Sequence, residues 1–276
     1  MKIALCFHGY FLNSGGINAA FASWEYLRRK VYPHGKIDVF FHCWDQGDET
    51  RDMIKNMYDP IKVQYEPQKD FKEEMKSLNQ DWFDEGFDRD STMYKSNSIF
   101  QTFSFLYSRK RVLELKAEHE EENKFKYDAV ILARPDIGTR GKEHPQKYYV
   151  TDIGFDPTVD MNKLYAAYWN QMNWGYADHW FYSSSENMDL VGTAYDKIST
   201  YYKPDSDYCK SITEGWFDSN AEDEFSNEHM KVEEIRTDNL VKFDKWQCID
   251  NHKFYKWFFK DVGLYEKTCY VDVTGG

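Results

Sequence analysis

The chain has 276 residues, 41% of them hydrophobic and 18% aromatic, with a formal net charge of −12. This length suits one large α/β domain or two small ones. The acidic balance argues against nucleic-acid binding, which needs clustered Lys and Arg; the densest basic stretch is only Arg109-Lys110-Arg111.

The five cysteines show no CxxC spacing, and two of them, Cys6 and Cys43, fall inside apolar runs. The odd count and the missing framework predict reduced thiols and a cytoplasmic setting. The first apolar run, residues 3–7, is too short for a signal peptide, and no stretch approaches the length of a transmembrane helix.

The N-terminal part reads as a βαβ unit. Residues 3–7 predict a strand, residues 17–30 a helix with apolar residues at helical spacing, and residues 37–42 a second strand. Such a unit closes as a right-handed, parallel pair of strands. A helix after Asp48 and a short strand at residues 61–65 follow, and then a charged excursion at 68–90.

The strongest helix is predicted at residues 98–122, and it leads into a strand at 129–133. Beyond Gly138 the strands become shorter, and we expect them at 163–168 and 179–183. Single helices are expected at 185–200 and 222–234, followed by an aromatic cluster, Phe254, Tyr255, Trp257 and Phe258. The pattern predicts one α/β domain over residues 1–276 with a mostly parallel central sheet flanked by helices, divided into halves 1–138 and 139–276.

The apolar run at residues 129–133 stops abruptly at Arg134-Pro135-Asp136. Strands covered on both faces have this pattern, and open α/β sheets bind ligands at the carboxyl ends of their strands. An Asp at this place can hold Mg²⁺ or Mn²⁺ together with a diphosphate. Arg134 can form two parallel hydrogen bonds either to a phosphate or to the carboxylate of Asp136. The alternative is a structural salt bridge in which Asp136 caps the next turn.

Two more strand ends carry candidate nucleotide-binding residues. His8, Gly9 and Tyr10 follow the first strand, where glycine lets backbone N–H groups approach a phosphate or a base. This loop matches neither the dinucleotide motif nor the P-loop. After the second strand, Trp44 can stack on a ring of the ligand while Asp45 accepts hydrogen bonds from ribose hydroxyls. Alternatively, Trp44 only packs against the edge of the sheet.

A fourth candidate is the segment YADHWF, residues 176–181. A carboxylate beside aromatic residues at the start of a strand suits holding sugar hydroxyls or acting as a general base, and a plain turn is the alternative. Asp178, with aromatic residues such as Trp180 beside it, is therefore a candidate for contact with a donor or acceptor sugar. The isolated His252 or His229 could complete a metal shell, although a lone His is more often structural.

Five segments carry a resemblance to a known family: "IALCFHGYF", "IDVFFHCWD", "NSIFQTFSFLYSRKRVLELK", "FKYDAVILARPDIG" and "ADHWFYSSSENMDLV". In this order they resemble the nucleotide-sugar glycosyltransferases with the GT-A fold that are found in bacterial surface-polysaccharide clusters and in viruses and phages. The resemblance implies a Rossmann-like nucleotide half followed by a more irregular acceptor half.

The resemblance also implies roles for the candidates. Arg134 and Asp136 stand where GT-A enzymes place their DxD motif, with an arginine in the position of the first aspartate. Dependence on Mn²⁺ or Mg²⁺ is therefore left open, because Arg134 can itself offset diphosphate charge. The resemblance further implies that His8, Gly9 and Tyr10 lie near the nucleotide, and that Asp178 and His179 face the donor sugar or the acceptor.

The predicted function is transfer of a sugar from a nucleotide-diphosphate donor to the hydroxyl of a glycan acceptor. Asp136 would hold the diphosphate, with a metal or without one. Asp178 would act as the base if the anomeric centre inverts, or orient sugar hydroxyls if its configuration is retained. The main alternative is a non-catalytic glycan- or nucleotide-binding module on the same fold. A nucleotidyltransferase or methyltransferase is less well supported, because neither type of glycine-rich loop is present.

Overall fold

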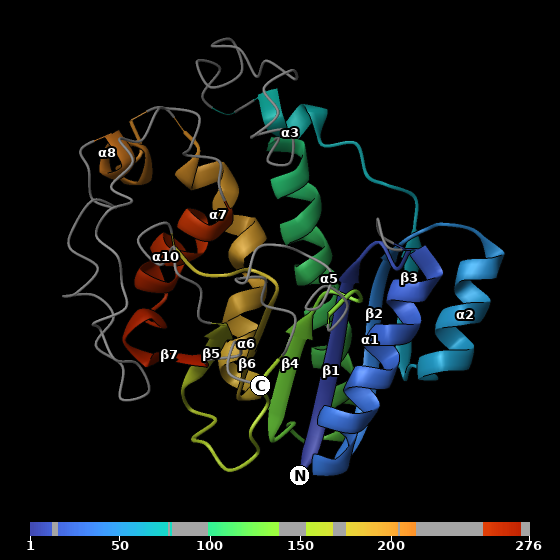
Figure 1. Cartoon of the computed structure of the whole chain (residues 1–276). Coiled ribbons are helices and arrows are strands. Elements are labelled where there is room, and N and C mark those ends of the chain that lie inside the picture. The colour runs from blue at the N-terminus through green and yellow to red at the C-terminus, as the bar shows by residue number, and fades with distance from the viewer. Residues whose placement is uncertain are drawn as a thin grey trace, which may run out of the picture.

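In the computed structural model the chain builds one seven-stranded sheet with helices on both faces (Figure 1). Strands from both halves of the sequence belong to this sheet. The structure describes residues 1–12, 16–76, 78, 99–137, 153–167, 175–203, 205–213 and 251–271. The predicted helix at 222–234 and His229 lie outside these residues.

The sheet has a parallel part and a mixed part. Its order is β3-β2-β1-β4-β6-β5-β7, and β1 pairs in parallel with both β2 and β4, as β2 does with β3. β6 is antiparallel to β4 and β5, whereas β7 is parallel to β5. The prediction of an α/β fold with a mostly parallel sheet is confirmed. The strands are β1 (Lys2–Gly9), β2 (Lys36–Trp44), β3 (Lys62–Glu66), β4 (Ala129–Ala133), β5 (Leu164–Ala167), β6 (Trp180–Ser183) and β7 (Thr268–Val271).

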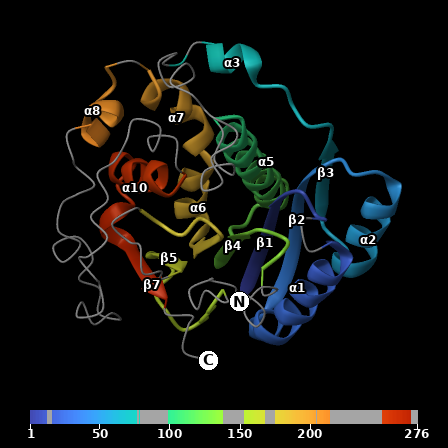
Figure 2. The same cartoon turned by 45° about the horizontal axis from the view of Figure 1, so that its top comes forward.

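Helices cover the two faces of the sheet in separate groups. α1 and α2 lie on one face, and α5, α6, α7 and α10 lie on the other (Figure 2). The described helices are α1 (Gly16–Lys30), α2 (Asp48–Tyr58), α3 (Lys72–Lys76), α5 (Ile99–Asn123), α6 (Ser185–Gly192), α7 (Ala194–Tyr201), α8 (Asp207–Thr213) and α10 (Asn251–Asp261), with 3₁₀ turns at Tyr32–His34 and Tyr265–Lys267.

Each face of the sheet has its own hydrophobic core, which explains the unbroken apolar runs. In β1, Leu5 and Phe7 point into the core beneath α1 and α2, whereas Ala4 and Cys6 point into the core beneath α5. Because successive side chains in a strand alternate between faces, a strand covered on both sides turns nearly every side chain toward a core. β4 is the clearest case, since all five of its residues are buried.

Residues 185–200 form two helices rather than the single one predicted. Thr193 lies between them: its backbone N–H and its Oγ1 both bond to Leu190 O, which closes α6 before α7 begins. The helices α8 and α10 and the strand β7 were not predicted; the aromatic residues of α10 were interpreted only as a cluster. In α10 the buried Phe254, Tyr255, Phe258 and Phe259 recur at helical spacing.

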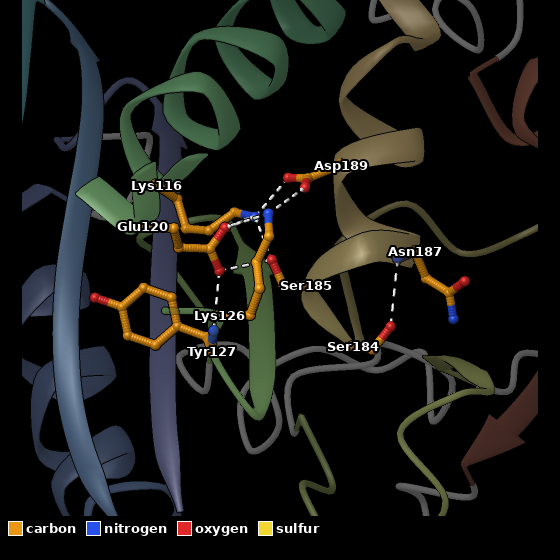
Figure 3. Close-up of polar contacts among 8 residues, drawn as sticks. All are labelled: Lys116, Glu120, Lys126, Tyr127, Ser184, Ser185, Asn187 and Asp189. Atoms are coloured by element: carbon orange, nitrogen blue, oxygen red, sulfur yellow. Dashed lines mark hydrogen bonds and ion pairs between the residues drawn. The ribbon is translucent and has the colours of Figure 1, made fainter. Parts of the chain in front are cut away.

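A buried polar network ties α5 to α6 and to the amino end of β4 (Figure 3). Glu120 is only 1% exposed, and its carboxylate accepts four hydrogen bonds. The donors are Ser185 Oγ at 2.6 Å, the Tyr127 N–H at 2.9 Å, Lys126 Nζ at 2.9 Å and Lys116 Nζ at 3.1 Å. A buried charge with this many partners is tolerated, whereas an isolated one is not.

The buried ammonium of Lys116 completes the network. It also donates to Ser185 Oγ at 2.7 Å and to Asp189, which lies on α6. Ser184 caps the N-terminus of α6, where its hydroxyl accepts from the Asn187 N–H (Figure 3). The segment "SSENMD" therefore anchors a helix instead of contributing to the site described below.

The described cysteines and helices bear on the predictions of reduced thiols and of no transmembrane segment. Cys6, Cys43, Cys209 and Cys269 are buried free thiols, and Cys248 lies outside the described part of the chain. Within the described ranges, no helix combines the length and the apolar composition that crossing a membrane would require.

Candidate functional site

Four chain segments meet at one edge of the sheet. β1, β2 and β4 end at this edge, and β6 begins there because it runs antiparallel to β4, with Ala133 opposite Trp180. The Arg134 N–H donates to His179 O at 3.2 Å, which joins the segment after β4 to the segment before β6. Three of the predicted motifs therefore lie side by side where α/β sheets bind ligands.

Arg134 and Asp136 form a two-pronged ion pair at the end of β4. Arg134 Nε lies 2.9 Å from Asp136 Oδ1, and Nη2 lies 2.7 Å from Oδ2. The side chain of Arg134 is 28% exposed and that of Asp136 is 9% exposed. The pairing that the sequence left open, Arg134 on Asp136, is the one observed, and it fixes the orientation of both groups.

The Asp178 carboxylate lies nearby with few partners. Its side chain is 13% exposed, and its closest charged contact is from Oδ1 to His252 Nδ1 at 3.9 Å. It makes no hydrogen bond with any described residue. Burial favours a higher pKa for Asp178, but His252 and the surrounding positive groups outweigh it, so its pKa lies below the usual value. Asp178 is therefore an anion whose oxygens accept no hydrogen bond from the described part of the chain.

Two imidazoles flank this carboxylate. Burial lowers the pKa of His179 to about 4, and Arg134 adds to this effect while Asp178 opposes it. His252, at the start of α10, bonds through Nδ1 to Tyr176 O at 2.6 Å, and the Tyr176 N–H donates to His252 O at 3.2 Å. These reciprocal bonds attach α10 to the segment that carries Asp178.

Arg109 lies on α5, in the interior just beneath the site, and is 1% exposed. Its Nε donates to His8 Nε2 at 3.1 Å, and its Nη2 donates to the backbone carbonyl of Asp178. The guanidinium carbon lies 4.0 Å from the centre of the Phe105 ring, a cation–π contact. Arg109 thus links the end of β1 to the start of β6.

The backbone after β1 is held from below by a chain of hydrogen bonds. The Gly9 N–H donates to Ser108 Oγ at 2.7 Å, Ser108 lies 2.6 Å from His42 Nδ1, and His42 Nε2 lies 2.5 Å from Glu66 Oε1. Gly9 has a φ of +94°, a conformation that favours glycine. Although these groups have the order of a nucleophilic triad, Ser108 and His42 are fully buried, so the chain is a support for the Gly9 backbone.

The described residues do not by themselves provide a metal centre. Asp136 is held by Arg134, and no group of three or more His, Cys, Asp or Glu side chains within the described ranges is arranged to hold an ion. Oxygen-rich ligand sets are what Mg²⁺ and Mn²⁺ require. We therefore derive no step through a metal at Asp136 or His252.

Four predicted residues lie apart from this cluster. Trp44 is buried and stacked on Tyr107, with 5.7 Å between ring centres. Trp180 is buried in the core beneath α1, and Asp45 is bonded to Arg51 of α2. The hydroxyl of Tyr10, a residue 40% exposed, donates to a glutamine, Gln68, at 3.1 Å.

No protein-family model and no curated protein sequence matches this chain. The assignment of a function therefore depends on the geometry of the edge at which β1, β4 and β6 meet. Of the residues predicted from sequence, those whose side chains this edge brings together are His8, Arg134, Asp136, Asp178, His179 and His252.

Sequence reasoning missed Arg109 and the Ser108–His42–Glu66 chain. Arg109 had been noted only as part of a basic stretch. A signal was present, because Arg109 lies three residues after Leu106 and four before Leu113, both of which are buried in α5. A charged residue on the buried stripe of a helix needs a partner in the interior.

Proposed function

We propose that the chain is a GT-A-type glycosyltransferase that moves a sugar from a nucleotide-diphosphate donor to a glycan hydroxyl. The observation that carries the proposal is the Asp178 carboxylate, which takes no hydrogen bond from any described residue and lies beside Arg134 at the edge where β4 ends and β6 begins. A parallel part followed by a mixed, more irregular part also agrees with the nucleotide and acceptor halves that the sequence resemblance implies.

In this proposal the diphosphate lies at the end of β4, near Arg134. Breaking the bond between the anomeric carbon and the diphosphate oxygen leaves the electron pair on the departing diphosphate. A fixed guanidinium stabilises this developing charge without reorganisation. The Asp136 carboxylate holds that guanidinium in place through two hydrogen bonds, so its role is orientation of Arg134.

Asp178 is assigned to the sugar hydroxyls. An efficient general base has a pKa near the working pH, whereas the pKa of Asp178 lies below the ordinary carboxylate value. An ionised carboxylate is instead suited to accept hydrogen bonds from hydroxyl groups and to stabilise positive charge at the anomeric carbon. The proton of the acceptor hydroxyl then passes to the departing diphosphate.

The test combines binding and turnover. UDP-, GDP- and dTDP-sugars, each with and without Mn²⁺, are screened by thermal shift and by release of nucleoside diphosphate. A donor at 100 times its Kd stabilises the fold by about 2.7 kcal/mol. With a donor that binds, Asp178→Asn should lower turnover by about 100-fold or more while donor binding persists.

The matched control is Asp196→Asn, because Asp196 is an exposed carboxylate on α7 that pairs with Lys110. It should keep the wild-type turnover. Equal turnover in wild type and Asp178→Asn would remove Asp178 from the mechanism. If no donor stabilises the protein and none is hydrolysed, the glycosyltransferase proposal is wrong.

The closed Arg134–Asp136 pair specifically favours one other function, a non-catalytic module that binds a nucleotide or glycan on this fold. Such a module would be stabilised by a nucleotide sugar or by a glycan, but it would release no nucleoside diphosphate with any donor and acceptor. The same screen therefore separates the two functions.

A further inference from the structure

Arg109 contacts the imidazole of His8 in the interior of the protein. The guanidinium of Arg109 is an obligate donor, because arginine stays protonated and has no acceptor atom. Its Nε–H points at His8 Nε2 across 3.1 Å. His8 Nε2 must therefore carry a lone pair rather than a proton.

A neutral imidazole has one protonated and one unprotonated nitrogen. With Nε2 accepting from Arg109, the proton of His8 lies on Nδ1. A second proton on Nε2 would set two N–H groups and two positive charges against each other inside the protein. Nδ1 makes no hydrogen bond within the described part of the chain.

The groups around His8 all favour the uncharged ring. They are Arg109 on α5, Arg134 after β4 and His42 on β2. The Phe105 ring packs edge to face with the His8 ring, with 5.1 Å between the ring centres. Burial, reinforced by these positive groups, places the pKa of His8 well below its ordinary value.

We infer that Arg109 is a positioning residue that holds His8 as a neutral imidazole with its proton on Nδ1, and that His8 binds an acceptor oxygen of the nucleotide through this N–H. The first part depends only on the contact in the interior, and the second part rests on the proposed function. Arg109 also donates a hydrogen bond to the backbone carbonyl of Asp178. One side chain therefore positions both His8, on the nucleotide side of the proposed site, and the segment of Asp178, on its sugar side.

The first experiment needs no ligand. The full chain is labelled with ¹⁵N-histidine, and long-range ¹H–¹⁵N correlations are recorded at pH 7; the His8 signals are those lost in His8→Asn. We expect a neutral ring protonated on Nδ1. A ring protonated on Nε2, or a doubly protonated ring, overturns the inference.

The variants Arg109→Met and Arg111→Met separate the contact from a general loss of charge in α5. Arg111 lies two residues further along and bonds to Glu114 and Gln64 on the other side of the helix. Arg109→Met should raise the pKa of His8 and release the fixed tautomer, and Arg111→Met should leave the tautomer unchanged. A fixed tautomer in folded Arg109→Met overturns the role of Arg109. If circular dichroism shows Arg109→Met to be unfolded, the wild-type spectrum still decides the tautomer.

The second experiment titrates UDP, GDP and dTDP into wild type and three variants of His8. Asn carries its amide N–H near the position of Nδ1, Gln carries it near Nε2, and Leu has none. We expect His8→Asn to bind within about threefold of wild type and the other two about tenfold more weakly, the value of one hydrogen bond. Equal affinities in all three overturn the contact with the nucleotide. An Nδ1-protonated His8 in a protein that binds none of UDP, GDP and dTDP supports the positioning by Arg109 and overturns the proposed function together with the nucleotide contact.

Discussion

Removing the buried carboxylate of Glu120 should destabilise the fold by about 3 kcal/mol. In Glu120→Leu the Tyr127 N–H loses its acceptor in the interior, and the Lys116 ammonium loses one of its two carboxylate neighbours. Breaking a buried ion pair from one side costs ~3–5 kcal/mol. We take the lower end because Asp189 still pairs with Lys116 after the change.

Urea unfolding followed by circular dichroism measures this loss. The matched control is Glu118→Leu on the same helix, since Glu118 is 52% exposed and pairs with Lys62 at the surface. Exposed pairs of this type contribute less than about 1 kcal/mol. Removing both charges, in Lys116→Met with Glu120→Leu, should recover part of the stability lost in Glu120→Leu alone. If Glu120→Leu and Glu118→Leu unfold at the same urea concentration, the network does not stabilise the contact between α5 and α6.

Two more predictions concern the residues around the site. The pKa of His8 is far lower in the folded state than in the unfolded state, so only the unfolded state gains a proton as the pH falls below about 6.5. The free energy of unfolding should therefore fall by up to about 1.4 kcal/mol per pH unit. Urea unfolding at pH 7.5 and 5.5 should show a smaller loss of stability in His8→Asn than in wild type, and an equal loss contradicts this role of His8. Gly175→Ala should cost about 2 kcal/mol more than Gly47→Ala in the same assay, because both have positive φ but only a Cβ at Gly175 would meet a backbone atom, His252 O at 2.0 Å. Equal losses in the two alanine variants would show that this close contact is relieved at little cost.

The parallel half of the sheet was predictable because its signals are local. Residues 129–133 form an unbroken apolar run, and the strand β4 has these same bounds. Helix α5 shows regular apolar spacing and was predicted within one residue at each end. The break at Thr193 was not foreseen, because the apolar pattern continues across it, and α10 was missed among aromatic residues.

The candidate site was predictable only in part. Position at a strand end indicated Arg134 and Asp178, and both lie at the edge where β4 ends and β6 begins. The same rule also indicated Trp44 and Trp180, yet both are buried, because packing on the faces of the sheet decides where large rings lie. Arg109 was missed because a charged residue in a predicted helix is usually interpreted as part of the solvent-exposed face.

The direction of β6 explains why the site could not be assembled from the sequence. An apolar run such as residues 180–183 reads the same in either direction, and four residues give no indication of their partner strand. A parallel β6 would place Asp178 at the amino edge of the sheet, far from Arg134. Because β6 is antiparallel to β4, its first residue lies opposite the last residue of β4, and the segment carrying Asp178 meets the segment carrying Arg134. The antiparallel direction of β6 therefore brings the Asp178 carboxylate, from the second half of the chain, to the edge of the sheet at which β1 and β4 end.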